Sequence, residues 1–292
     1  MSAVSGLPTV SARRRYTDKV MRGLLGAATC VALVPLILII YYLLHKGISS
    51  WTTSGFFSTD PNGNFFGNPG GIRSAIFGTL EIVALASAIS IPIGIGVALY
   101  LTEYGKDSRY ASLIRYFVDV MTGVPSIMFG LFVYIVLVIA HTGGSGFAGW
   151  KGAIAIALLM LPIVIRSVEV VLLLVPSDLR EAALALGAPR WQVIRRVVLP
   201  TATPGIVTGL LLAIARGMGE TAPLLFTVSL ATVLTGNLNQ QMNTLPLQIF
   251  NDITSPRNEI VARAWGAALT LVALVLIFNL IARAIARRSR MA

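Results

Sequence analysis

Two arginine–glutamate pairs stand inside long apolar runs of this sequence. Arg216 precedes Glu220 by four residues and Arg166 precedes Glu169 by three, so each pair shares one face of a helix. A charge at bilayer depth costs at least about 2.5–3.5 kcal/mol, so each pair should face a cavity or a charged partner. The planar guanidinium matches two oxygens of an oxyanion and stays charged at any working pH. The pairs predict an anion path lined by Arg166, Glu169, Arg216 and Glu220; ion pairs that only fix helix register are the alternative.

A carboxylate beside such a path would select anions by their protonation. It can accept a hydrogen bond from an anion that carries a proton, and it repels an anion that carries none. Phosphate carries such a proton at pH 7, whereas sulfate does not. Glu220 is therefore a candidate for discriminating phosphate from sulfate.

The composition places these pairs in a membrane protein. The chain is 55% hydrophobic and 12% charged, and its mean hydropathy is +0.80. Runs of about 18 apolar residues can cross a hydrocarbon core about 30 Å thick, and lipid admits only helices or closed barrels. Cys30 is the only cysteine, so no intrachain disulfide can form. We predict an all-α integral membrane protein with six transmembrane helices, at residues 24–44, 74–101, 117–140, 152–175, 204–234 and 264–282.

The positions of Lys and Arg predict the orientation. Sixteen of these residues fall in alternate segments, at 1–22, 102–116, 176–203 and 283–292, and only five fall on the other side. An excess of basic residues marks the cytoplasmic side, so both termini are predicted to be cytoplasmic. The same scattered placement argues against a nucleic-acid groove. The predicted organisation is a cytoplasmic N-terminal segment at 1–22, a transmembrane domain at 23–285 and a cytoplasmic tail at 286–292.

The loop between the fourth and fifth predicted spans, residues 177–200, has the pattern of two short amphipathic helices. Asp178 and Glu181 have the spacing of a capping box at the start of the first helix, and Gly187 can adopt the left-handed conformation that ends it. This elbow is too small to form a core, so it lies on lipid headgroups or binds a partner. Its apolar stripes are Leu179, Ala182, Ala183 and Leu186 on the first helix, and Trp191, Ile194 and Val198 on the second.

The spacing within the elbow resembles the EAA loop of type I ABC-importer permeases. The family pattern is E-A-A-x3-G-x9-I-x-L-P, and this chain departs from it in having Val197 where isoleucine is usual. In that family the loop docks into a groove of a cytoplasmic ATPase subunit. The resemblance therefore implies coupling to an ATPase through Glu181, Ala182, Ala183, Gly187, Trp191, Val197, Leu199 and Pro200.

ATP hydrolysis is expected on a separate subunit. The sequence contains no G-x-x-x-x-G-K-[ST] motif, which is the loop that cradles nucleotide phosphates. We therefore expect this chain to bind no cofactor and to catalyse no reaction, while ATP and Mg²⁺ are used by the partner. His45 and His141 are single histidines near span ends, so no metal site is expected.

A longer stretch, residues 161–226, resembles the permease subunits of phosphate importers, the PstA family. The matching pieces are LPIVIR, TPGIVTG and ARGMGETAPLLF, and AIFGTLEI, GVALYLTEY and DVMTGVPSIMFGLFVY extend the resemblance upstream. It implies a type I ABC-importer permease fold in a bacterial inner membrane, with Arg166, Arg216 and Glu220 in the translocation path. It also implies a PstC-type sister permease, two copies of a cytoplasmic ATPase subunit and an extracytoplasmic phosphate-binding protein.

Three other functions remain open at this stage. The anion could be molybdate or sulfate in the same importer scheme, or the chain could be the PstC-like sister subunit. A secondary transporter that uses Arg216 and Glu220 as an ion-coupled site is the third. Loss of transport when the ATPase genes are deleted would separate an importer of the ABC kind from a secondary transporter.

Overall fold

The computed structural model describes residues 11–62, 68–105, 108–144 and 146–288. Parts of the predicted segments 1–22 and 286–292, and Lys106 among the orienting residues, lie outside these ranges. Within them the regular structure is helical, apart from one isolated bridge between Pro61 and Gly70. The prediction of an all-α fold is confirmed.

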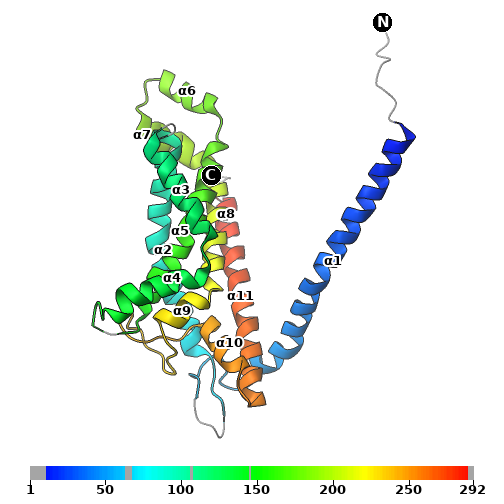
Figure 1. The fold of residues 1–292 in the computed structure, drawn as a ribbon, viewed down its shortest axis with the longest axis vertical. Helices are drawn as coiled ribbons and strands as arrows, with labels where there is room; N and C mark the ends of the chain where they lie inside the picture. The colour runs from blue at the N-terminus through cyan, green and yellow to red at the C-terminus, as the bar shows by residue number, and fades with distance from the viewer. Residues whose placement is uncertain (1–10, 63–67, 106–107, 145, 289–292) are drawn as a thin grey trace.

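Eleven α-helices and three π-helical segments form the described fold (Figure 1). Several have lengths and apolar faces that only burial in lipid or against another helix explains. Their bounds are α1 Ala12–Trp51, α2 Arg73–Leu99 with η1 Tyr100–Tyr104, α3 Arg109–Gly123, α4 Ser126–Val133 with η2 Tyr134–Ile139, α5 Gly149–Leu173, α6 Ser177–Ala185, α7 Arg190–Val193 with η3 Ile194–Val198, α8 Leu199–Met218, α9 Ala222–Thr227, α10 Leu245–Ile253 and α11 Asn258–Arg288.

Five continuous helical stretches in the described chain are long and apolar enough to cross a membrane, and a bent pair brings the number to six if counted as one span. The bent pair corrects the predicted third span, 117–140. α3 and the α4–η2 helix meet at 102° because the chain turns at Val124 and Pro125. Pro125 has no N–H for a helical bond and disfavours helical geometry at Val124, so a straight helix cannot pass through them.

The predicted fifth span, 204–234, was wrong at both ends. The helix starts at Arg190, because α7, η3 and α8 run on without a break, and it ends at Met218. The second half of the predicted elbow is therefore the first part of a transmembrane helix. Beyond the break at Gly219, only the short α9 is helical before α10.

α5 lies at the centre of the core, between α2 and α8 (Figure 1). Small residues let α8 approach α5 closely. A Cβ placed on Gly209 would lie 2.5 Å from the Cβ of Ser167, and one on Gly217 would lie 2.8 Å from the Sδ of Met160. A larger side chain at either position would force the helix axes apart, so the two glycines fix how α8 and α5 align.

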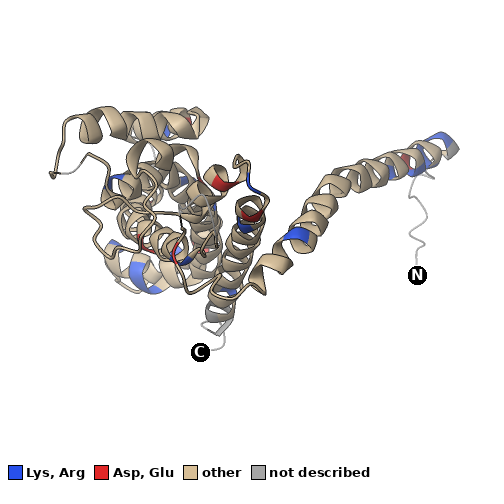
Figure 2. Cartoon of the chain, turned by 90° about the horizontal axis from the view of Figure 1, so that it is seen from below, with Lys and Arg blue, Asp and Glu red and all other residues tan. Residues whose placement is uncertain are grey.

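α1 leans away from the other helices and meets them at one end only (Figures 1 and 2). Its most apolar window has no buried residue, although its mean hydropathy is 2.5. Its main contact among the described helices is α11, where the Ser50 hydroxyl donates to the carbonyl of Ala262 at 2.7 Å and the Trp51 indole donates to Thr270 at 3.0 Å. A helix this apolar requires cover by lipid or another protein along most of its length.

The two ends of the bundle differ in what they carry. We call them the elbow end, where α6 lies, and the loop end, where α10 lies (Figure 1). The described N-terminal end of α1 and the described C-terminal end of α11 both lie at the elbow end, the arrangement that the orientation argument predicted.

The capping box predicted in the elbow was wrong. α6 starts at Ser177, directly after Pro176, and no side chain caps it, so Asp178 lies within the first turn. An acidic residue there still opposes the positive end of the helix dipole. Gly187 adopts φ +80°, which confirms its predicted left-handed conformation.

Two polar networks hold the loop end together. The carboxylate of Asp252 accepts from Arg263 at 2.7 and 2.8 Å and from Gln248 at 2.7 Å, and all three residues are buried. Asp60 accepts from Arg73 at 2.9 and 3.2 Å and from the backbone N–H of Leu234 at 3.1 Å. Burial alone raises the pKa of Asp60, but these donors outweigh it and hold that pKa below its usual value.

Candidate functional site

The predicted pair of Arg166 and Glu169 is present and belongs to a larger group. Arg166 Nη1 donates to Glu169 Oε2 at 2.8 Å, as the i, i+3 spacing predicted. The other carboxylate oxygen, Oε1, accepts from Arg115 Nε at 2.8 Å, so Glu169 bridges two guanidinium groups. The Glu169 side chain is only 5% exposed, and two cations compensate its burial.

A fourth charge completes this group. Asp119 pairs with Nη2 of Arg166, on the opposite side from Glu169. We call Arg115, Asp119, Arg166 and Glu169 the four-residue cluster; its formal charges cancel. α3 contributes the first two residues and α5 the last two. Arg115 was counted only among the orienting charges of the segment 102–116, and Asp119 was not among the predicted path residues, because their distance from Arg166 along the chain hides the contact. Their own i, i+4 spacing on a short amphipathic segment was the one available signal.

The second predicted pair stands at the end of α8. Arg216 Nη2 lies 2.9 Å from Glu220 Oε1, which confirms the expected ion pair. The Arg216 side chain is 57% exposed and that of Glu220 is 11% exposed. Between them the helix ends at Met218, and Gly219 and Glu220 lie outside helical structure. Interrupted helices at membrane depth are tolerated where the freed backbone lines a cavity or a protein contact.

The packing of α8 on α5 fixes the relative depths of the two charged groups. Gly209 lies against Ser167, next to Arg166, whereas Gly217, next to Arg216, lies against Met160. Seven residues of α5 separate these two levels, which is about 10 Å at 1.5 Å per residue. Arg216 therefore lies about 10 Å nearer the loop end than Arg166.

Some of the predicted coupling residues are exposed, and the others are half-buried. Glu181, Ala182, Gly187, Trp191 and Pro200 are exposed, and Ala183, Val197 and Leu199 are half-buried. The first predicted stripe is uncovered, with Leu186 90% exposed. The second stripe is split: Ile194 and Val198 are buried in this chain, because their helix continues into α8, and only Trp191 stays outside.

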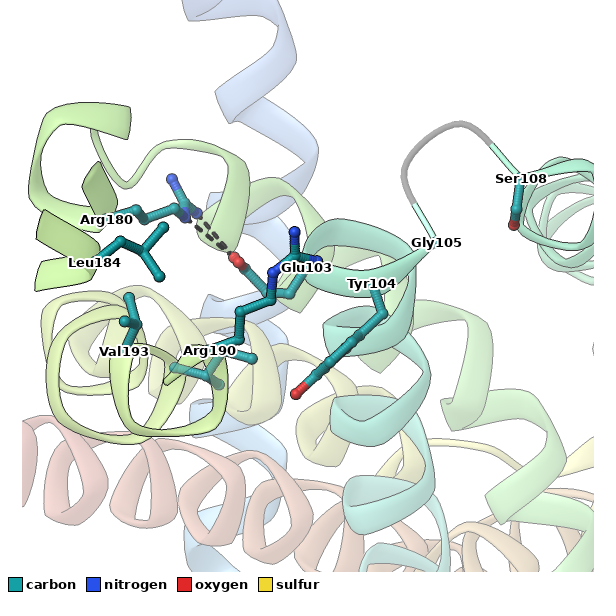
Figure 3. A pocket seen from close by; sticks show the side chains of 9 residues that line it. Glu103, Tyr104, Gly105, Ser108, Arg180, Leu184, Arg190 and Val193 are labelled. Atoms are coloured by element: carbon teal, nitrogen blue, oxygen red, sulfur yellow. Dashed lines mark hydrogen bonds and ion pairs between the residues drawn. The ribbon is translucent and has the colours of Figure 1, made fainter. Parts of the chain in front are cut away.

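A cavity of about 520 Å³ lies between the elbow and the end of α2 (Figure 3). Arg180 points from the first turn of α6 toward Glu103 on η1, and Tyr104, Leu184 and Arg190 also line the cavity. Arg180 Nη2 and Nε donate to Glu103 Oε1 at 3.0 and 3.2 Å. The sequence analysis treated Arg180 as an orienting charge only and missed this contact.

Known proteins resemble this chain in sequence and in fold. Residues 90–291 match the family model described as "Binding-protein-dependent transport system inner membrane component". The chain is 40% identical over 272 residues to the phosphate transport system permease protein PstA of Haemophilus influenzae, covering 92% of this chain and 94% of that protein. It is 39% identical over 283 residues to the phosphate transport system permease protein PstA 1 of Mycobacterium tuberculosis (strain CDC 1551 / Oshkosh), covering 95% and 92%.

The fold is similar to that of a solved bacterial alginate ABC transporter in complex with its alginate pentasaccharide-bound periplasmic protein. The TM-score is 0.64 at 16% sequence identity, with 94% of this chain and 96% of that chain covered. At this identity the likeness establishes the fold alone, and that fold is the predicted one of type I ABC-importer permeases.

Proposed function

The chain belongs to the binding-protein-dependent transport system inner membrane components, and within them to the PstA permeases; on this premise we propose that it carries inorganic phosphate into the cell. A permease subunit of an ABC importer works with an ATPase and a substrate-binding protein. The finer assignment is a PstC-type sister permease beside this chain, two copies of a cytoplasmic ATPase subunit and an extracytoplasmic phosphate-binding protein. The complex resides in the bacterial inner membrane, with both termini of this chain in the cytoplasm.

One observation carries the assignment of the anion. The guanidinium of Arg216 is exposed beside the carboxylate of Glu220, at the point where a membrane helix is interrupted. The guanidinium supplies donors for two phosphate oxygens, and the carboxylate accepts a hydrogen bond from the hydroxyl group that monohydrogen phosphate still carries. Sulfate has no such proton, so the same carboxylate repels it.

Two features support an assembly with a second membrane subunit. The Arg216 side chain is exposed on the surface of this chain, so a second subunit that faces it would enclose the path. α1 exposes nearly its whole length, apart from its contact with α11. The exposed stripe of α6, with Leu186 outermost, supports docking of the ATPase at the elbow end.

Transport proceeds by alternating access, without covalent chemistry on this chain. The ATPase hydrolyses ATP with Mg²⁺ and displaces the elbow, and the displacement turns the anion path from one side of the membrane to the other. The residues of this chain bind and release the anion. This chain holds no cofactor of its own and is not an enzyme.

Uptake of radiolabelled phosphate from a low external concentration tests this function in cells that lack the gene. The chain should restore uptake, and deletion of the ATPase partner should abolish it again. Uptake that survives deletion of the ATPase would favour an ion-coupled secondary transporter. Unchanged phosphate uptake in the cells lacking the gene would refute phosphate as substrate, and molybdate and sulfate would be assayed next.

The role of Glu220 is tested by competition. Glu220→Gln removes the repulsive charge, so excess sulfate should inhibit phosphate uptake more strongly in the variant than in the natural chain. Both chains must be equally abundant in the membrane. Equal inhibition of the two chains by sulfate would remove Glu220 from anion selection.

A further inference from the structure

α6 makes all of its described side-chain hydrogen bonds to the membrane helices through Arg180. None of its residues is buried, and its main neighbours among the described elements are α7 and η3 of the same elbow. Arg180 differs from the other residues of the helix, because its side chain is only 16% exposed and points toward the bundle (Figure 3).

Arg180 reaches the ends of two membrane helices. Its Nη1 donates to the carbonyl of Val175 at 2.6 Å and its Nη2 donates to the carbonyl of Leu172 at 2.8 Å, both at the C-terminal end of α5. Nη2 and Nε also donate to Glu103 at the end of η1, which continues α2. One guanidinium thus binds the elbow to α5 and to α2 at the same time.

The charges at this junction explain why an arginine is needed. The C-terminal ends of α5 and of α2–η1 each carry partial negative charge from free carbonyls, and Glu103 adds a full negative charge. The Glu103 side chain is 10% exposed, so water screens it little. Arg180 is its ion-pair partner in the described chain, and the rigid fork can satisfy carboxylate and carbonyls together.

The same segment leads onward to the four-residue cluster. Two residues before Glu103, the carbonyl of Leu101 accepts from Arg115 Nη2 at 2.9 Å. Arg115 donates in turn to Glu169, which pairs with Arg166. Hydrogen bonds and ion pairs, together with the backbone between Glu103 and Leu101, therefore join the elbow to the charges inside the bundle.

We propose that the Arg180–Glu103 ion pair is the link through which displacement of the elbow moves α2 and α5 and, with them, the four-residue cluster. The proposal rests on the proposed function, because the ATPase supplies the displacement. The cavity of about 520 Å³ beside the pair gives these side chains room to move as the elbow turns. Arg180 and Glu103 act as positioning residues and need not touch the anion.

The test measures phosphate uptake and ATP hydrolysis together, in proteoliposomes that contain the complete importer with its binding protein. Glu103→Ala removes the link but leaves the bonds from Arg180 to Val175 and Leu172. We expect ATP hydrolysis to continue, while the phosphate moved per ATP falls by about 5- to 150-fold, the usual range of coupling between sites. Glu103→Gln keeps the shape and one acceptor, so it should give an intermediate ratio.

Charge exchange and a matched control sharpen the test. Arg180→Glu combined with Glu103→Arg restores opposite charges, and should recover part of the ratio lost by Arg180→Glu alone. Asp18→Ala is the control. It breaks the exposed 2.7 Å ion pair between Asp18 and Arg22 in the part of α1 that lies at the elbow end, and it should leave the phosphate moved per ATP unchanged.

The outcomes separate this proposal from the proposed function. If Glu103→Ala and Glu103→Gln move as much phosphate per ATP as the natural chain, the link is refuted. A parallel fall in uptake and hydrolysis, at an unchanged ratio, also refutes it and leaves a purely structural ion pair. If the natural complex moves another anion instead of phosphate, the proposed function fails, and the same ratio measured with that anion decides the link.

Discussion

The four-residue cluster and the Arg216–Glu220 pair place arginines at two depths of one bundle, and the arginines differ in how much of their hydrogen-bonding capacity is used. Arg166 donates to Glu169 and pairs with Asp119, and Arg115 donates to Glu169 and to a backbone carbonyl. Arg216 has one ion-pair partner among the described residues and is 57% exposed.

The difference separates an arginine that holds helices together from one that is free to bind a ligand. A guanidinium has five N–H donors. Arg216 has one ion-pair partner, whereas Arg166 uses three donors, for Glu169, Asp119 and the carbonyl of Arg115, so more donors remain for an anion at Arg216. We infer that in this conformation the anion binds at Arg216, and that the four-residue cluster must rearrange before the anion passes toward the elbow end.

The largest effect should come from removing the bridging carboxylate of the cluster. Glu169→Ala leaves two arginines facing each other in a site that is mostly shielded from water. Breaking a buried ion pair by removing one partner typically costs about 3–5 kcal/mol, so membrane abundance and thermal stability in detergent should fall sharply. Asp18→Ala on exposed α1 is the control and should change neither. A fully stable Glu169→Ala would show that the cluster does not hold α3 to α5.

Arg216→Ala should give the reverse pattern, with loss of transport and little loss of stability. Hydrogen bonds to charged groups contribute about 1.5–3 kcal/mol, so phosphate uptake should fall by about 10- to 100-fold. The variant must reach the membrane at the natural level, which immunoblotting of membrane fractions can check. Full uptake by Arg216→Ala would make this pair as structural as the cluster and would remove the contrast between them.

Asp119→Asn should have a smaller effect, and it should strengthen the binding of phosphate where Arg216→Ala weakens it. Asp119 competes with the anion for Arg166, and its side chain is 62% exposed, so its pairing is weak. Removing its charge should lower the phosphate concentration for half-maximal uptake by up to about fivefold, and should also slow maximal uptake. A raised half-maximal concentration would mean that Asp119 assists the anion instead of competing with it.

The smallest effect should appear at Asp60, outside the path. Because its pKa is lowered in the folded protein, the Asp60 carboxylate stabilises the fold at pH values above its unfolded-state pKa of 3.8. That contribution is lost as the pH falls below 3.8 and through the lowered folded pKa. Melting curves in detergent should therefore show a steeper acid loss for the natural chain than for Asp60→Asn, with uptake per ATP equal at pH 7.

Local spacing was enough to predict the Arg166–Glu169 pair, because residues three apart on a helix share a face. Arg216 and Glu220 also pair, although the helix ends between them. The contacts of Asp119 and Arg115 with α5 could not be predicted in this way, because they depend on how α3 packs on α5, and the spacing within one segment does not contain that information. Glu103 and Arg180 were missed for the same reason: they lie 77 residues apart along the chain.

The helix boundaries were harder to predict than the class of fold. Hydropathy identifies apolar runs, but it does not show that Pro125 turns the chain, or that the continuous helix that contains α8 begins at Arg190 in the elbow. The apolar run continues past Gly219, so hydropathy alone extended the fifth helix through a break. Breaks of this kind depend on backbone geometry and on the neighbours that satisfy the freed backbone groups.

The attachment of α1 to α11 has a consequence for synthesis of the chain. The hydrogen bond between Ser50 and Ala262 can form only after the ribosome has added Ala262, which is 212 residues after Ser50. At about 5–20 residues per second, that delay is roughly 10–40 s. During this time α1 has no partner from its own chain, so it must be stable in the bilayer as a single helix. α11 then packs against α1, so this contact forms only after the helices between them have been made.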